Sequence, residues 1–84
     1  MRLTDTKDLT VERGAVYGHP KVDFARVTGM AKFLDDCPNP VARHALYMVL
    51  VKVARLIESP GHKDSWDDIQ GYARCGKMVM DLEE

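Results

Sequence analysis

Three aspartates flank the chain's only tryptophan in the stretch GHKDSWDDIQGYA, residues 61–73. Such carboxylates can bind a divalent cation, pair with nearby cations, or favour the start of a helix. On a helix, Asp64, Asp68 and Tyr72 share one face because they are four residues apart, whereas Asp67 points elsewhere and is expected in solvent. Aspartate is also a preferred N-cap, so capping alone would account for Asp64. It would not account for Asp68, which lies beyond the cap and next to apolar positions.

The preceding apolar segment, residues 40–58, carries the cations that could pair with these carboxylates. Lys52 and Arg55 are three residues apart in this segment. A buried charge without a partner is very costly, and the short turn that follows makes the two segments antiparallel neighbours. We therefore predict that both cations form an ion-pair network with Asp64 and Asp68. The alternative is that both cations extend their aliphatic stems and reach solvent.

The same side chains could instead form a binding site. Two carboxylates can bind Mg²⁺ and leave the rest of its shell to waters and phosphates, while lysine and arginine suit phosphate oxygens. Mg²⁺ is therefore a candidate cofactor, with Asp64 and Asp68 as its candidate ligands. The candidate ligand-binding residues are Lys52, Arg55, Asp64, Asp68, Tyr72, Tyr17 and His19. For Tyr17, packing against the bundle with one hydrogen bond is the favoured alternative. No residue is assigned as catalytic, since no serine or cysteine has a visible base and no spacing suggests zinc.

Regular hydrophobic spacing predicts helices through most of the chain. Apolar positions recur at helical spacing over residues 21–34, and Asn39 followed by Pro40 is typical of an N-cap and a first helical residue. That helix is expected to end near Glu58. Gly18 is free to adopt a positive φ in the bend before the first of these helices.

The last helix is expected to start at Asp64 or Ser65 and to end near Leu82, and a short N-terminal helix is expected over residues 5–13. No alternating pattern with hairpin signals predicts a sheet, although the β-branched residues leave a strand as an alternative for residues 40–58. The predicted fold is all-α: one domain, residues 1–84, forming a small helical bundle of three main helices plus a short N-terminal helix.

Self-association is expected from the balance between size and hydrophobicity. A chain of 84 residues, 45% of them hydrophobic, buries only about 60–65% of its unfolded surface on folding. Residues 40–58 are apolar nearly all round, which is typical of the centre of a bundle. Two partner helices cannot cover such a helix, so we predict a homo-oligomer, a dimer or higher.

Composition excludes several other classes of protein. A net charge of −1 gives no reason to expect a nucleic-acid or anionic-membrane partner. The longest apolar segment is too short and too charged to span a bilayer, and residues 1–10 lack the hydrophobic core of a signal peptide. Cys37 and Cys75 show no metal-binding spacing and are interpreted as reduced thiols. The expected location is the cytoplasm.

Three stretches in order, ERGAVYGHPKVDFARV, MVLVKVARL and GHKDSWDDIQGYA, resemble a family of small phage and prophage proteins of uncharacterised function. The resemblance covers residues 11–77 and would place the chain in the host cytoplasm. This family looks distantly like the all-α nucleoside-triphosphate pyrophosphohydrolases of the MazG type. Those are oligomeric, Mg²⁺-dependent enzymes with an EExxE motif on one helix and an ExxD-like motif on the next. DSWDD could stand for the second motif, but the helix that should carry the first supplies Lys52 and Arg55, with Glu58 as its only acid.

Three functions follow from these observations. The first is a small phage accessory protein that binds a host or phage protein, or a nucleotide-like ligand, as a homo-oligomer and without catalysis. The second is a Mg²⁺-dependent pyrophosphohydrolase-like enzyme with a reduced, intersubunit active site. The third is a structural helical module only. The missing EExxE motif favours binding over catalysis.

Overall fold

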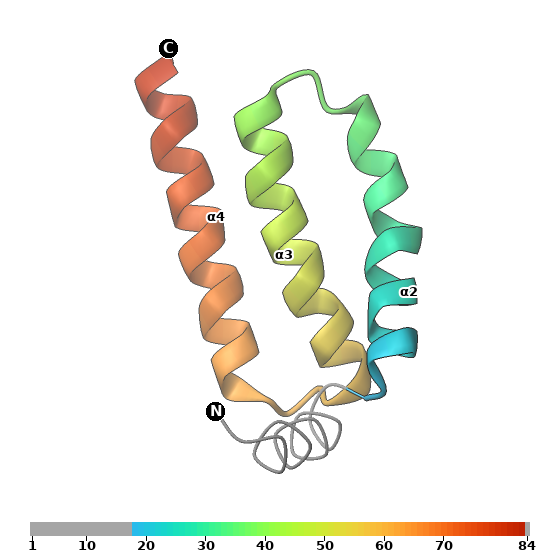
Figure 1. Ribbon diagram of the computed structural model, residues 1–84. Coiled ribbons are helices and arrows are strands. Elements are labelled where there is room, and N and C mark those ends of the chain that lie inside the picture. Colours follow the sequence, from blue (N-terminus) through green and yellow to red (C-terminus); the bar gives the residue numbers. More distant parts are fainter. Residues whose placement is uncertain (1–17, 84) are drawn as a thin grey trace, which may run out of the picture.

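The computed structural model describes residues 18–83, which fold into helices only (Figure 1). Helix α2 (Pro20–Ala31) continues into a short 3₁₀ helix, η1 (Lys32–Asp36), and is followed by α3 (Pro40–Glu58) and α4 (Lys63–Glu83). No strand occurs in this part of the chain. The all-α class and the three main helices are confirmed, whereas the expected N-terminal helix lies outside the described residues.

Helix α3 has the bounds that its sequence predicts. The Asn39 side chain accepts hydrogen bonds from the backbone N–H groups of Val41, at 2.9 Å, and Ala42, at 3.0 Å. Pro40 occupies the first turn, where a missing N–H costs nothing because that N–H has no partner within a helix. The predicted N-cap is therefore confirmed.

The start of α2 is fixed by the bend that precedes it. Gly18 has a φ of 80°, a conformation that is open to glycine. His19 is the N-cap, and its Nδ1 accepts a hydrogen bond from the Lys21 N–H at 3.1 Å. Pro20 again provides the first helical residue. The candidate ligand residue His19 therefore caps a helix at the surface of the molecule.

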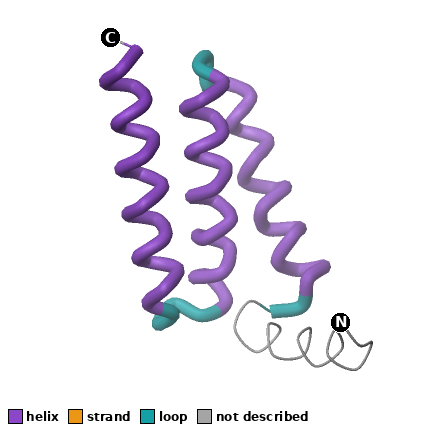
Figure 2. The backbone as a smooth tube through the Cα atoms, turned by 60° about the vertical axis from the view of Figure 1, so that its left-hand side comes forward, coloured by secondary structure: helices purple, strands orange, loops and turns teal. Residues whose placement is uncertain are grey.

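Helix α3 lies between α2 and α4 and contacts both, while α2 and α4 do not contact each other (Figures 1 and 2). An ion pair between Arg26 and Glu58, at 2.8 Å, joins α2 to α3. At the other interface, a Cβ atom built on Gly76 of α4 would lie 3.2 Å from the Cβ atom of Ala45. The missing side chain of Gly76 therefore lets α4 approach α3 closely.

This open arrangement encloses almost no core. Among the described residues, only three hydrophobic side chains are buried, Val27, Ala54 and Leu56. By contrast, ten large hydrophobic side chains are exposed: Val22, Phe24, Phe33, Val41, Leu46, Tyr47, Ile57, Trp66, Met78 and Leu82. The central position predicted for residues 40–58 is confirmed, but their two neighbours leave much of α3 uncovered.

Candidate functional site

A predicted ion pair joins α3 to α4. Lys52 Nζ lies 2.9 Å from Asp68 Oδ2, and the two side chains are 13% and 45% exposed. The lysine is thus largely removed from water while its carboxylate partner remains half in solvent. The prediction that Asp68 is more than a solvated helix acid is confirmed. The contact forms because Lys52 on α3 and Asp68 on α4 lie at facing positions of the helical hairpin.

The other two members of the predicted network lie elsewhere. Asp64 is exposed in the first turn of α4, and Arg55 lines a cleft that α3 forms with α2. Helix α4 begins at Lys63, so Asp64 is not its N-cap. An acid in the first turn is still favoured there, because its charge opposes the positive end of the helix dipole.

Local hydrogen bonds explain the conformation of much of the stretch around Trp66. Ser65 is 1% exposed, and its hydroxyl lies 2.8 Å from His62 Nδ1. The Trp66 indole N–H donates to the carbonyl of Pro60 at 2.9 Å and so closes the turn between α3 and α4. Asp67 is exposed, as predicted. Residues 60–66 therefore build a helix start, and Asp68 is the residue that links it to α3.

Replacing Asp68 by alanine is expected to lower the free energy of unfolding by about 1–2 kcal/mol. Breaking a fully buried pair costs about 3–5 kcal/mol, but solvent can partly replace a carboxylate that is 45% exposed. Urea unfolding should show this loss, and Asp67→Ala, on the solvent face, should stay within about 0.5 kcal/mol of the wild type. Adding Lys52→Met should restore part of the loss, since it removes the stranded charge. Equal stability of the two alanine variants would contradict a structural role for the pair.

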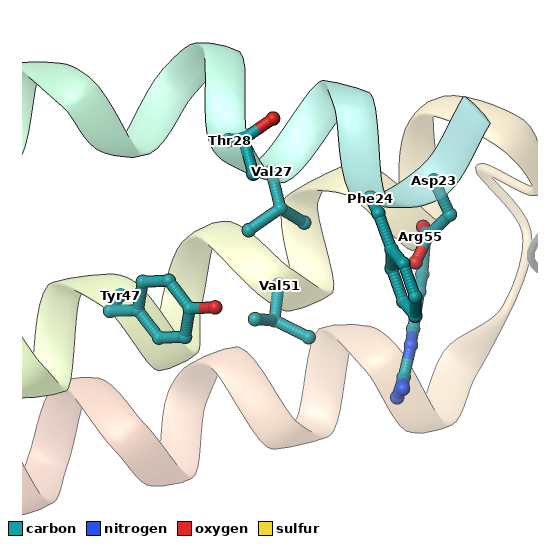
Figure 3. A pocket seen from close by; sticks show the side chains of 7 residues that line it. All are labelled: Asp23, Phe24, Val27, Thr28, Tyr47, Val51 and Arg55. Atoms are coloured by element: carbon teal, nitrogen blue, oxygen red, sulfur yellow. The ribbon is translucent and has the colours of Figure 1, made fainter. Parts of the chain in front are cut away.

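A second polar feature lies in the cleft between α2 and α3 (Figure 3). The cleft has a volume of about 330 Å³, and both helices contribute to its lining: Asp23, Phe24, Val27, Thr28, Tyr47, Val51 and Arg55. Asp23 is buried, at 7% exposed, and lies with Arg55 at one end, while Tyr47 lies at the other (Figure 3). Of the residues singled out from the sequence, only Arg55 is found here.

Sequence reasoning missed Asp23, although a signal was present. Asp23 precedes the buried Val27 by four residues, so the two share the face of α2 that meets α3. An acid on the apolar face of a helix is unusual and needs an explanation.

The remaining candidates are spread over the molecule. Tyr72 lines two grooves between α3 and α4, one on each side of their contact. Tyr17 lies outside the described residues. In residues 18–83, no group of three or more His, Cys, Asp or Glu side chains could hold a metal ion. Within one chain, Asp68 is engaged by Lys52, so Mg²⁺ binding by Asp64 and Asp68 stays a prediction.

Together, the fold and its clefts define a small helical protein in which ion pairs join α3 to both of its neighbours and a partly polar cleft lies between α2 and α3. The chain belongs to a family described as a domain of unknown function, DUF6378, whose sequence pattern matches residues 3–80. It is also similar to the Gene 55 protein of Mycobacterium phage D29, with 30% identity over 70 residues. The match covers 83% of this chain and 46% of that protein, so the chain spans slightly under half the length of this relative.

No solved structure matches the chain. The prediction of a phage-related family is confirmed by these comparisons, whereas the likeness to MazG-type enzymes rests on the sequence resemblance alone. Within the described residues, no helix is both long and apolar enough to cross a membrane.

Proposed function

We propose that this protein is a small phage accessory protein that acts by binding, as a homo-oligomer and without catalysis, in the host cytoplasm. The main support is the open layer of helices, in which only three hydrophobic side chains of residues 18–83 are buried. A surface with this much uncovered apolar area is typical of a protein that is completed by a partner. The first partner that it requires is a second copy of the chain.

The groove between α3 and α4 is the surface that fits such a copy. Its volume is about 390 Å³, and its lining is apolar except for Tyr72 and Lys77: Ala42, Ala45, Leu46, Val49, Ile69, Tyr72, Ala73, Gly76, Lys77 and Met80. Leu46 is 45% exposed. At the turn between the same two helices, Ile57 and Trp66 are 54% and 52% exposed. Depletion of charge at the centre of a surface distinguishes interfaces from ordinary protein surface. A symmetric dimer is the simplest closed assembly that would cover this apolar surface.

A binding role is also consistent with the polar side chains. Glu58, the only acid of α3, is engaged by Arg26, and Asp68 is engaged by Lys52. The alternative that the resemblance implies, a Mg²⁺-dependent pyrophosphohydrolase-like enzyme, would need further carboxylates from a neighbouring subunit. The partner of the assembled dimer is then a host or phage protein, or a small ligand.

Sedimentation and thermal denaturation with a nucleotide panel test the two halves of this proposal. We expect a mass of at least twice 9.5 kDa, and no conversion of nucleoside triphosphates with or without Mg²⁺. A concentration-independent monomer would contradict self-association. A Mg²⁺-dependent rise in melting temperature, with formation of monophosphate and pyrophosphate, would identify an enzyme instead.

A further inference from the structure

One carboxylate oxygen of Asp23 is buried without a hydrogen-bond partner among the described residues. The residue is 7% exposed, and its Oδ1 has no hydrogen-bond partner in the part of the chain that the structure describes. Removing a carboxylate oxygen from water without a replacement hydrogen bond is costly. A buried polar atom of this kind therefore needs an explanation, and a donor from a bound molecule provides one.

The surroundings of Asp23 have the size and character of a small-molecule site. The cleft of about 330 Å³ lies within the range of volumes found for ligand pockets. Val27 and Val51 supply aliphatic walls from the two helices. In Figure 3 the side chains of Asp23 and Phe24 lie toward one end of the cleft, and the Tyr47 ring lies at the opposite end. A few polar groups between apolar walls are the usual composition of such sites, and here Asp23, Thr28, Tyr47 and Arg55 supply them.

We propose that this cleft binds the protonated amine of a small molecule with an apolar or aromatic body, and that Asp23 is its counter-ion. An ammonium group carries three hydrogen-bond donors and no acceptor. It can therefore donate to Oδ1 without placing an acceptor of its own against the carboxylate. A charged donor bonds a carboxylate more strongly than a neutral one, and low local polarity increases the difference. Phe24 lines the same cleft, and an aromatic ring there can add a cation–π contact.

Arg55 limits the ligands that fit. Arg55 lines the same cleft, so a second positive charge on the ligand would be repelled, whereas a carboxylate would be attracted. Simple monoamines and free α-amino acids meet this condition, and diamines do not. The two sources share the ammonium group that Asp23 would bind, and they differ in the carboxylate that Arg55 would attract.

The inference rests on the proposed function in one respect, because the ligand is bound and not converted. It does not depend on self-association, since no residue that lines this cleft also lines the α3–α4 groove. A monomeric protein that binds the amine would contradict the oligomer and support the ligand site. A dimer that binds no amine would support the oligomer and contradict the ligand site.

Titration of the full chain with three probes, followed by amide NMR shifts, tests the site. The probes are 2-phenylethylamine, its uncharged analogue 2-phenylethanol, and L-phenylalanine. We expect the amine to shift amides of residues 23–28 and 47–55 and to bind at least about ten-fold more tightly than the alcohol. Tighter binding of L-phenylalanine than of the amine would identify amino acids as the source, and weaker binding would identify simple amines.

Two matched variants locate the effect. Asp23→Asn keeps the shape of the side chain and removes its charge, and it should weaken amine binding at least about ten-fold without changing the binding of the alcohol. Asp36→Asn is the control, because Asp36 is exposed and does not line the cleft; it should bind like the wild type. Equal binding of amine and alcohol by the wild type would overturn the proposal, as would the absence of cleft shifts at about 10 mM amine. The wild-type comparison remains decisive even if Asp23→Asn does not fold.

Discussion

Replacing Leu46 by glutamate is expected to convert the proposed dimer into a monomer. Leu46 lines the apolar groove between α3 and α4 and is 45% exposed in one chain, so the glutamate reaches solvent in the monomer. In the dimer, the same carboxylate is taken out of water without a partner, which costs about 3–5 kcal/mol. Twofold symmetry places the substitution on both sides of the interface. Sedimentation at several concentrations should show dimerisation weakened by at least about 100-fold.

A second surface substitution separates this effect from a general loss of hydrophobicity. Met78 also lies on the exposed surface of α4, at 57%, and lines neither groove between α3 and α4. Met78→Glu should therefore keep the mass of the wild type. A Leu46→Glu variant that remains dimeric would place the interface elsewhere, and equal dissociation of both variants would remove the argument for this groove.

The helices could be predicted because local chemistry determines where they begin and end. Asn39 caps α3 by accepting bonds from residues two and three positions further along, and Pro40 follows it directly, so no distant part of the chain is needed to recognise the cap. The start of α4 was predicted less accurately. Its first turn is organised by the bond between His62 and Ser65 rather than by an aspartate cap, and residue preferences at N-caps do not favour histidine.

The two polar sites differ in how far the sequence could locate them. The Lys52–Asp68 pair could be predicted, since a short turn makes α3 and α4 antiparallel and fixes which residues meet. Asp23 lies in the cleft with Arg55 only because α2 packs against α3 at one angle and register. The connection between them, η1 and its flanking residues, carries no pattern from which that register follows. Sequence reasoning therefore assigned Arg55 to the carboxylates on α4.

The close contact of α3 and α4 gives the second prediction, which concerns two glycines of the same helix. Gly71 has open space where a side chain would begin, whereas a Cβ atom on Gly76 would lie 3.2 Å from the Ala45 Cβ atom. Either glycine costs about 1 kcal/mol of helix stability relative to a good helix former. Gly71→Leu is therefore expected to raise the free energy of unfolding by up to about 1 kcal/mol.

Gly76→Leu is expected to do the opposite, because the remaining atoms of the leucine have no room beside Ala45 and would force α4 away from α3. Overpacking of this kind costs about 1–3 kcal/mol, and here it also disturbs the Lys52–Asp68 pair on the same two helices. After the gain in helix propensity of about 1 kcal/mol, a net loss of up to about 2 kcal/mol remains, equivalent to a fall in melting temperature of up to roughly 16 °C. Thermal unfolding of both variants at one protein concentration measures the difference directly. If Gly76→Leu is as stable as Gly71→Leu, then α3 and α4 do not approach each other closely at Gly76, and the groove proposed for self-association has a different shape.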